Sequence, residues 1–411
     1  MKKSLALIFI IPFSLYAESL SQLVELSKNN KMIESSQRNL ESVEKGYDSL
    51  KAGYLPQVSI SADYQETNKE TSSVPDNRST VQGTVSYVLY DGGKKYDLFD
   101  SYEAQIRSSS ENLTNQKNEI VLQVINYYYN YLTYEAQKES KQKEIEQLNA
   151  EYKRLKRFLD VGSATEDEVQ KIISNIESAQ VELHELELNI QTIIHNLEYV
   201  VGKSVTIEDG SQIKDYESKE VKLRADLRAL EHDLEAQLAT AKSQRSDYLP
   251  TLTISDSYSS NDLNYKTAAL SGNSSDYEQN IAAVNLNWKI FDFGSANKSY
   301  ESEYKKYLAL KSQYEYEKNK ASVDLKLALK AYEIGKLKIK SAKAGLKAAN
   351  SAYESIKAKF QNGLVDNVSY LEALSEKYDA KSTLDAALNE LEIDKANIIY
   401  YSGENLEEFV K

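Results

Sequence analysis

Histidines and carboxylates are the side chains of this sequence that could hold a metal ion or transfer protons. The 411 residues include 63 aspartates and glutamates but only three histidines, His184, His195 and His232. The first two would lie on one helix face about 16 Å apart, too far to share a metal ion. Carboxylate pairs are so frequent in this composition that they select no catalytic site. We therefore predict ordinary surface histidines and no metal site.

The sequence also lacks the other reactive groups that would indicate an enzyme. It has no cysteine, which excludes thiol nucleophiles, thiolate metal ligands and disulfides. The glycine pair in Asp91-Gly92-Gly93-Lys94 does not have the spacing of a phosphate-binding loop. The net charge of −13 disfavours a nucleic-acid partner. These features predict a protein that is not an enzyme and has no cofactor and no nucleic-acid partner.

Residues 1–17 have the parts of a secretory signal peptide. Lys2 and Lys3 precede an apolar run over residues 5–15, and the small residue Ala17 closes the segment. We expect the mature chain to start near Glu18. After this signal no apolar run approaches the roughly 20 residues that a membrane-spanning helix needs. The sequence thus predicts an exported protein without a transmembrane helix.

The sequence contains an internal duplication. Tyr-Leu-Pro occurs at 54–56 and again at 248–250, an offset of 194 residues (248 − 54). Later motifs keep an offset of 201 residues, as in the pair Gly162 and Gly363. A register held over this length indicates two copies of one structural unit. The predicted domains are a first repeat at 18–202, a connector at 203–222, a second repeat at 223–403 and a C-terminal tail at 404–411.

Each repeat carries the pattern of a helical hairpin. Apolar residues step by alternating threes and fours over 321–360 and over 169–197, which is the pattern of a coiled-coil seam. Many seam positions hold alanine or tyrosine, which favours wide, sheet-like packing of the helices. Gly162 and Gly363 are the predicted turns at the tips of the two hairpins.

The helix lengths can be predicted as well. The long helices are expected to run from after Gly93 to about Asp160 and from after Gly294 to about Gln361, each about 100 Å long at 1.5 Å per residue. The stretches 20–52 and 166–200 are each about half as long. Laid end to end, these two shorter helices would match one long helix, so each repeat supplies one long helix and two stacked short ones.

A β-hairpin is predicted before each long helix, at about 56–91 and at 250–292. Apolar and polar residues alternate there, in the second hairpin as far as Ile290. The alternation suits barrel strands with one face on lipid and the other on an aqueous lumen. It also suits a half-buried sheet of a soluble protein. The export signal and aromatic residues near one strand end, such as Tyr90 and Trp288, favour the membrane.

Four strands are too few to close a membrane barrel, for which about eight is the smallest workable number. The chain must therefore form an oligomer. Two copies would give eight strands and a filled interior, whereas three copies would give twelve and leave room for water. The predicted fold is mainly α with a transmembrane β-barrel portion, and a transport role favours the trimer.

Short motifs recur in matching places of the two repeats. They are the Leu-Pro steps at 55–56 and 249–250, the Asp-Gly-Gly and Asp-Phe-Gly turns at 91–93 and 292–294, the helix turns Val161-Gly162 and Asn362-Gly363, and the segment Leu-Glu-Tyr-Val-Val-Gly at 197–202. In order and spacing, over essentially the whole mature chain, these motifs resemble the TolC-type outer membrane efflux proteins.

The resemblance implies a trimer with a 12-stranded barrel in the outer membrane and a periplasmic α-helical tunnel. Its implied function is the passive exit duct of a tripartite efflux or type I secretion system. The implied partners are two further copies of the chain, outer-membrane lipid, a periplasmic adaptor and an inner-membrane pump. Drugs, metals and proteins all leave through ducts of this kind, so the resemblance does not select a cargo or a particular pump.

The resemblance also implies a constriction at the tunnel mouth. In that family acidic residues ring the mouth soon after the two glycine turns, and the ungapped match places Glu168, Ser369 and Glu372 there. Asp167 and Asp366 are the next candidates. The alternative interpretation of Glu168 and Glu372 is a solvated helix face.

The same turns are the implied sites of docking and closure. The adaptor-docking residues would be those of the two turns: Val161, Gly162, Gly363 and Leu364. A member of that family holds its tip shut through a tyrosine before the second turn and an arginine after it. This sequence has Phe360 and Val365 at those positions, so its closing contacts must differ.

An exported coiled-coil protein with a structural or adhesive role is the alternative function. It would explain the heptad seams and the tyrosines. It does not explain why two amphipathic hairpins occupy matching places in the duplication, each just before a long helix of matched length.

Overall fold

The computed structural model of the chain describes residues 17–215, 221–267 and 276–411. Nearly all of the predicted signal peptide lies outside the described residues, as do residues 216–220 of the predicted connector. The chain divides into two compact units, and each takes segments from both repeats. Unit 1 comprises Met1–Ser35, Thr114–Ala225 and Asn319–Lys411, and unit 2 comprises Ser36–Leu113 and Asp226–Lys318.

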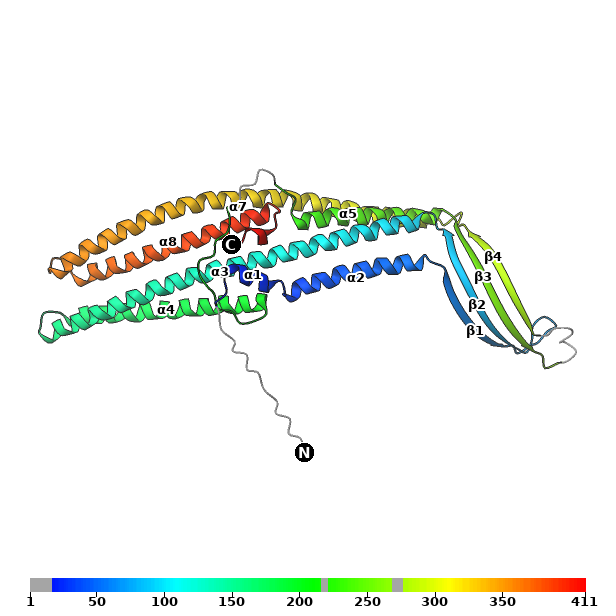
Figure 1. The fold of residues 1–411 in the computed structure, drawn as a ribbon, viewed down its shortest axis with the longest axis horizontal. Coiled ribbons are helices and arrows are strands. Elements are labelled where there is room, and N and C mark those ends of the chain that lie inside the picture. The colour runs from blue at the N-terminus through cyan, green and yellow to red at the C-terminus, as the bar shows by residue number, and fades with distance from the viewer. Residues whose placement is uncertain (1–16, 216–220, 268–275) are drawn as a thin grey trace, which may run out of the picture. The chain divides into compact units, whose positions relative to one another are not determined.

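Unit 2 contains an antiparallel sheet of four strands (Figure 1). The first repeat supplies β1 (Gln57–Glu66) and β2 (Asn77–Tyr90), and the second supplies β3 (Thr251–Asn264) and β4 (Tyr277–Asn287). The strands lie in the order β1-β2-β3-β4, so the two hairpins meet where β2 pairs with β3. In the part of the chain that the structure describes, β1 and β4 are edge strands.

One face of this sheet is mostly apolar and exposed. Alternation along the strands places Val58 opposite Val85, and Ile254 opposite Val284, on this face. Ile60 on the same face is 81% exposed. An ordinary half-buried sheet would cover such a face with a core. The opposite face carries mainly serine, threonine and glutamine.

The second hairpin is shorter than its alternation predicts. The prediction that the strand runs to Ile290 is wrong, because β4 ends at Asn287. Its partner β3 begins at Thr251, directly opposite Asn287, so the following residues have no strand to pair with. The indole of Trp288 instead donates a hydrogen bond to the backbone oxygen of Tyr248 (3.0 Å).

Helices of unit 2 pack side by side in the order α2, α3, α5, α7. They are α2 (Lys31–Gly53), the first part of α3 (Lys94–Asp160), α5 (Ala225–Ser243) and the first part of α7 (Ser295–Gln361). The short helix η1 (Gln244–Tyr248) follows α5. The bonds that set this order run from the Tyr47 hydroxyl to Glu103 (2.8 Å), from the Ser101 hydroxyl to the Ala236 carbonyl (3.1 Å), and from the Tyr314 hydroxyl to Glu231.

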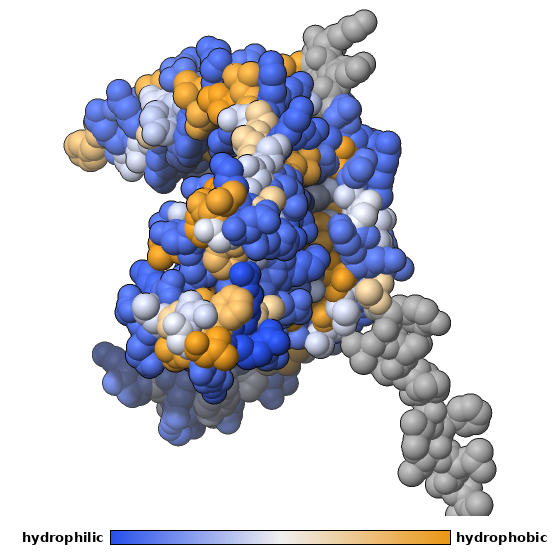
Figure 2. Space-filling view, turned by 90° about the vertical axis from the view of Figure 1, so that its left-hand side faces the viewer, coloured by the Kyte–Doolittle hydropathy of each residue, from blue (hydrophilic) through white to orange (hydrophobic). Residues whose placement is uncertain are grey.

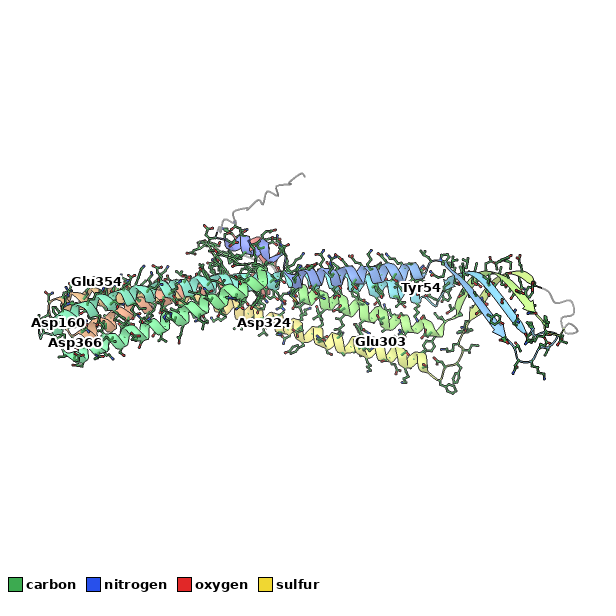
Figure 3. All side chains as sticks on the ribbon, turned by 90° about the horizontal axis from the view of Figure 1, so that it is seen from below. Tyr54, Asp160, Glu303, Asp324, Glu354 and Asp366 are labelled. Carbon is green, nitrogen blue, oxygen red and sulfur yellow. The ribbon has the colours of Figure 1, made fainter. Side chains whose placement is uncertain are left out.

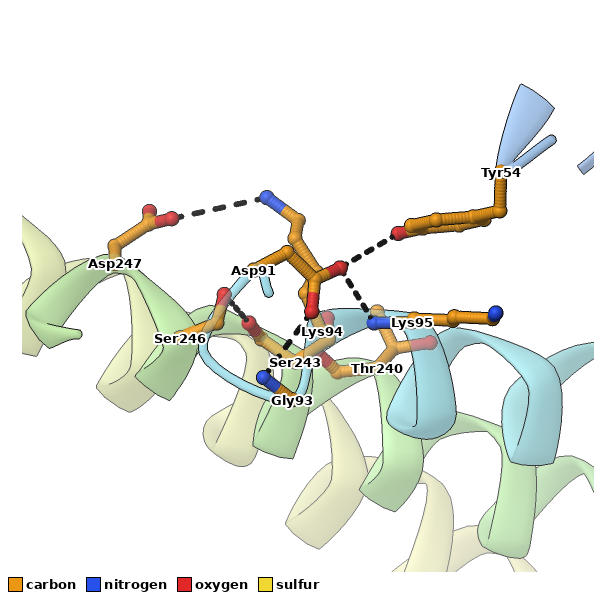
Figure 4. Close-up of polar contacts among 9 residues, drawn as sticks. All are labelled: Tyr54, Asp91, Gly93, Lys94, Lys95, Thr240, Ser243, Ser246 and Asp247. Atoms are coloured by element: carbon orange, nitrogen blue, oxygen red, sulfur yellow. Dashed lines mark hydrogen bonds and ion pairs between the residues drawn. The ribbon is translucent and has the colours of Figure 1, made fainter. Parts of the chain in front are cut away.

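Each long helix begins at a sharp corner that an aspartate caps. Asp91 accepts hydrogen bonds from the N–H groups of Gly93 (3.1 Å) and Lys95 (2.8 Å) and from the Tyr54 hydroxyl (2.9 Å) (Figure 4). Asp292 makes the equivalent backbone bonds in the second repeat, and they lower the pKa of its carboxyl. Both carboxylates satisfy N–H groups that the first helical turn leaves unpaired.

The two corners differ at one position. Gly92 has a φ of +73°, and a Cβ there would lie 2.8 Å from the backbone oxygen of Ser246. Phe293 stands at the equivalent place with a φ of 55° and is 93% exposed. The first corner packs against η1 and has no room for a side chain, whereas the second corner is open.

Unit 1 contains a layer of four helices in the order α4, α3, α8, α7 (Figure 1). α4 (Glu166–Val201) returns along α3, and α8 (Asn367–Tyr401) returns along α7. The contacts between neighbours include Lys141 of α3 with Glu182 of α4 (2.8 Å), Gln147 of α3 with Tyr378 of α8 (2.7 Å), and Lys338 of α7 with Glu390 of α8 (2.7 Å).

The hairpin α3/α4 and the hairpin α7/α8 share a buried core. All four helices contribute to it, with Leu148, Leu155, Val169, Ile172, Ile176, Ala179, Tyr353, Tyr370, Leu371, Ala373, Leu374 and Tyr378. Alanines and tyrosines of the predicted seams therefore do pack between helices. Farther along unit 1 are the short segments α1 (Leu20–Ser27) and η2 (Leu406–Phe409).

The first short helix is broken, which corrects the prediction of one helix over 20–52. α1 ends at Ser27, and α2 starts at Lys31. Asn30 causes the break, because its side-chain oxygen accepts a hydrogen bond from the Met32 N–H (2.8 Å) and starts α2. Its side-chain nitrogen donates to the backbone oxygen of Val200 (2.7 Å), which fixes the break against α4.

The predicted fold class is confirmed: two repeats of long paired helices carry one four-stranded antiparallel sheet. Within residues 17–215, 221–267 and 276–411, no helix combines the length and the hydropathy needed to cross a membrane.

The corner at Gly92 gives the first prediction. Gly92→Ala should lower the thermal midpoint of the purified protein in detergent more than Gly93→Ala does. Both glycines have positive φ, for which a Cβ costs about 1 to 2 kcal/mol, but only the Gly92 position would also force a clash with Ser246. Circular dichroism at one scan rate measures both midpoints. Equal shifts would contradict this account of the corner.

Candidate functional site at the helical turns

The two hairpins of unit 1 end in turns of the same design. Gly162 and Gly363 both have a φ of +72°. The N–H of the residue after each glycine bonds five residues back, from Ser163 to the Phe158 carbonyl (2.8 Å) and from Leu364 to the Lys359 carbonyl (2.9 Å). This is the usual αL ending of a helix, where glycine avoids the strain of a Cβ.

Capping residues start the returning helices immediately after the turns. The Thr165 N–H donates to the Glu168 carboxylate (2.8 Å), and the two residues form a capping box at the start of α4. Asp366 caps α8 by accepting a hydrogen bond from the Ser369 N–H (2.9 Å). The bonds from Ser369 lower the pKa of the Asp366 carboxyl. Glu168 and Asp366 therefore stabilise helix starts, in addition to any role at a mouth.

The surface of the turns combines apolar and acidic groups. Val161 and Leu364 are each 73% exposed. Figure 2 views the molecule from the end at which the turns lie and shows apolar patches among hydrophilic residues. Asp160, the last residue of α3, and Asp366 both lie at this end (Figure 3). Asp167 is exposed as well. The turns thus offer an open surface for a partner, with negative charge around apolar contact points.

Glu372 lies away from the turn surface, on the first turns of α8. It is exposed and lines a groove of about 350 Å³ between α3, α4 and α8. Ser369 is half-buried, and its N–H is engaged in the cap of α8. Within one copy of the chain, Glu168 lies in the first turn of α4 and Glu372 in the second turn of α8. Of the five predicted mouth residues, all of which the structure describes, Asp366 and Ser369 are joined by a hydrogen bond.

Phe360 is held between an aromatic ring and an arginine. Its ring stacks on Tyr370 with centroids 4.7 Å apart and an interplanar angle of 12°. The guanidinium of Arg154 lies 4.5 Å from the Phe360 centroid and 5.2 Å from that of Phe158. Because Arg154 is on α3, Phe360 on α7 and Tyr370 on α8, this cluster, the Phe360 clamp, joins the two hairpins next to their turns.

A buried polar group accompanies the clamp. Glu151, one turn before Arg154, is only 6% exposed, and its Oε1 has no hydrogen-bond partner. Its Oε2 lies 3.6 Å from the Arg154 guanidinium, and burial raises the pKa of the Glu151 carboxyl. Nearby, the Tyr353 hydroxyl donates to Gln147 (3.0 Å), which adds a second polar link between α7 and α3.

The sequence predicted Phe360 as a residue of tip closure, but it did not predict the residues that contact Phe360. Val365, which stands where a member of the resembled family has an arginine, is a half-buried aliphatic residue. The cation comes instead from Arg154 in the other repeat, and the stacking ring comes from Tyr370. The T-x-x-E signature at Thr165 could have revealed the capping role of Glu168. No local signal marks Arg154, because a helix-surface arginine is common in any coiled coil.

The part of the chain that the structure describes has no group of three or more His, Cys, Asp or Glu side chains placed to hold a metal ion. His184 bonds to Glu187 (3.1 Å), and His195 bonds to the Gln191 carbonyl (2.7 Å).

Comparisons with known proteins match nearly the whole chain. The family model described as outer membrane efflux protein matches residues 23–203 and 218–404, one segment in each repeat. The outer membrane protein TolC of Salmonella enteritidis is 21% identical over 412 residues, which cover 94% of this chain and 82% of that protein.

Solved structures share the fold. A membrane protein from Pseudomonas aeruginosa has a TM-score of 0.82 at 18% identity and covers 93% of both chains. The outer membrane protein VceC from Vibrio cholerae has a TM-score of 0.81 at 16% identity, covering 94% of this chain and 96% of that one. The Campylobacter jejuni CmeC outer membrane channel has a TM-score of 0.80 at 18% identity, covering 94% and 86%.

The Phe360 clamp gives the second prediction. Arg154→Gln should speed hydrogen exchange in the first turns of α8, because a cation–π contact contributes about 0.5 to 2 kcal/mol, equivalent to an increase of about two- to thirtyfold. Arg157→Gln is the matched control, since Arg157 is exposed and its side chain donates to the Lys153 carbonyl of its own helix (3.3 Å). Equal exchange in both variants, measured by mass spectrometry, would show that the clamp does not hold the hairpins together.

Proposed function

The chain belongs to the outer membrane efflux protein family, and from this we infer that it is the exit duct of a tripartite efflux or type I secretion system. It is a TolC-like protein of the outer membrane that extends into the periplasm. The proposed duct is passive: it gives exported cargo a water-filled path and opens when a periplasmic adaptor and an inner-membrane pump dock on it.

The observation that carries this proposal is the incomplete sheet. Its apolar face is exposed, with Val58 at 74% and Ile60 at 81%, and this suits contact with lipid. Its edges β1 and β4 need partners, because unpaired backbone groups are not tolerated in a bilayer. Three copies supply twelve strands, enough for a barrel with an aqueous lumen. We propose a homotrimer in which β4 of one copy pairs with β1 of the next.

The tunnel mouth is proposed to lie at the helical turns. Threefold symmetry would bring three copies each of Glu168 and Glu372 toward one axis. Ser369, three residues before Glu372 on α8, would lie beside them. Asp167 and Asp366 would add charge at the same level. Such a ring attracts cations and repels anions. The Phe360 clamp supports closure, because it ties the two hairpins together next to their turns.

The adaptor is proposed to dock on the turns themselves. Val161 and Leu364 supply apolar contact points, and Gly162 and Gly363 give the backbone its tight reversal. In this account the first repeat (18–202) and the second repeat (223–403) act as equivalent halves, so each trimer offers six similar tips. The connector at 203–222 and the tail at 404–411 lie outside the tips.

Ion selectivity tests the proposed mouth. In planar bilayers the purified trimer should show a small, cation-selective conductance that multivalent cations block. Glu168→Gln combined with Glu372→Gln should remove both properties. Glutamine can replace Glu168 in the capping box, so the start of α4 survives the substitution. An unchanged selectivity and block in the double variant would leave Glu168 with its capping role alone and Glu372 as a solvated helix residue.

Docking is tested by enlarging the turns. Gly162→Leu or Gly363→Leu should abolish export while the protein still reaches the outer membrane, because a leucine at a φ of +72° distorts the tip and adds bulk to its open surface. Gly345→Leu, on an exposed face of α7 with free space around it, is the matched control. Normal export by both tip variants would remove the turns from the docking mechanism.

A further inference from the structure

The polar face of the four-stranded sheet carries one pair of opposite charges. This face lies opposite the apolar one and presents alternate residues of β1, β2, β3 and β4. In these four strands, all of whose residues the structure describes, Arg78 of β2 is the cation on the polar face and Asp63 of β1 is the anion. The rest of the face is uncharged and consists mainly of serine, threonine, asparagine and glutamine.

Both charges lie near one end of the sheet. Arg78 is the second residue of β2, whose last residue, Tyr90, leads into α3 through the corner at Asp91. Asp63 pairs in register with Thr80, two residues along the strand from Arg78. The two charges are therefore at the end of the sheet that is farther from the helices. In the proposed barrel the polar face lines the lumen, and this end forms the outlet.

The Arg78 side chain is held in place but is incompletely bonded. Its Nη2 donates a hydrogen bond to the Tyr277 hydroxyl of β4 (3.2 Å), so the guanidinium reaches across the intervening strand β3. Its Nε is buried and has no hydrogen-bond partner in the part of the chain that the structure describes. An arginine binds a carboxylate through a planar pair of N–H donors. The unused Nε–H gives this guanidinium the capacity to bind such an acceptor.

A groove surrounds the guanidinium. Its volume is about 300 Å³, at the lower end of the range for small-molecule sites. All four strands line it, and both charged residues are part of the lining. Gln65, Gln82 and Gln279 add amide groups, which can donate and accept hydrogen bonds. The groove thus has the size and the polarity for a small, charged, hydrogen-bonding molecule.

One wall of the groove is fixed by its own hydrogen bonds. Asn261 of β3, which is only 4% exposed, accepts a hydrogen bond from the Thr80 hydroxyl (2.9 Å). Its side-chain nitrogen donates to the Ser259 hydroxyl (3.2 Å). These bonds join β2 to β3 beneath the reach of Arg78. A wall that is already ordered reduces the entropy lost when a ligand binds.

Asp63 can bind a cationic group next to the guanidinium. It stands diagonally opposite Arg78 across the β1–β2 pair, at a backbone separation of about 7 Å. Among the described residues neither side chain has an ion-pair partner. An anion and a cation at this spacing match the opposite charges of one small molecule better than they match a simple ion of either sign.

We propose that this groove binds a small zwitterion with a carboxylate and an ammonium group on one carbon atom, as in a free α-amino acid. The carboxylate binds Arg78, the ammonium binds Asp63, and the surrounding amides bind a polar side chain. The inference rests on the proposed function, because the groove faces the path of the cargo only in a closed barrel. It deepens that function by naming a chemical class that binds at the outlet. Each copy of the chain holds a complete groove.

Three matched probes test the ligand class. They are L-glutamine, glutaramate, which lacks the amino group, and 4-aminobutanamide, which lacks the carboxylate. Saturation-transfer NMR of the purified protein in detergent at low salt should show binding of glutamine. Each of the other two should bind at least about tenfold more weakly, because each loses a charge-assisted hydrogen bond. Equal binding of glutaramate would show a plain anion site and overturn the zwitterion. No binding of glutamine would overturn the site itself.

Two substitutions test the assigned residues. Arg78→Gln should weaken the binding of glutamine and of glutaramate by at least about tenfold. Asp63→Asn should weaken the binding of glutamine but strengthen that of glutaramate, because it removes a carboxylate that repels the anion. A misfolded variant cannot produce these opposite changes.

Matched controls change the same charges elsewhere. Lys69→Gln alters an exposed lysine just after β1, and Asp262→Asn alters an exposed aspartate on the apolar face of β3. Both should leave the affinities for glutamine and glutaramate unchanged. Controls that act as strongly as Arg78→Gln and Asp63→Asn would show a general charge effect and contradict the site.

The proposed function and this inference fail separately. A wild-type protein that neither forms trimers nor conducts ions would refute the duct, whereas glutamine binding, which needs one copy only, would persist. A conducting trimer that does not bind glutamine would refute only the groove.

Discussion

The hydrogen-bonding edges of the four-stranded sheet are the constraint on which the rest of the account depends. In water an edge strand can bond to solvent, but in a bilayer each unpaired N–H or C=O group costs several kcal/mol. The exposed apolar face places this sheet in lipid, so β1 and β4 must pair with other copies. Closure of the barrel then determines how many copies of the chain assemble. That number in turn determines how many helices and turns surround the symmetry axis.

Duplication lets one chain supply two similar walls of the duct, and the differences between the repeats follow from different neighbours. Gly92 packs against η1, whereas Phe293 at the equivalent corner is open and exposed. Thr133 meets Asn389 inside the chain, whereas their equivalents Ile334 and Leu188 are uncovered apolar residues. At the corner, the side chain follows the room that η1 leaves, whereas at Ile334 and Leu188 the equivalent positions carry apolar residues that the described chain leaves uncovered.

Much of this fold could be predicted from the sequence because its signals are local. Heptad spacing, the glycine turns and strand alternation gave the long helices and both hairpins. The errors came where a tertiary contact decides: β4 stops at Asn287 because β3 begins opposite it, and Asn30 breaks the first helix while bonding to Val200. The Phe360 clamp escaped prediction for the same reason, since Arg154 and Tyr370 reach Phe360 from other helices. The proposed roles of Glu168 and Glu372 at the tunnel mouth depend on other copies of the chain, which no sequence signal places.

Native mass spectrometry of the full mature protein, released from outer membranes in detergent, tests the central claim most directly. The account predicts one dominant species with the mass of three chains, whose ion conductance in a lipid bilayer is lost when it dissociates. A monomer that inserts into the bilayer, resists extraction and conducts ions alone would show that four strands suffice, and would contradict the account.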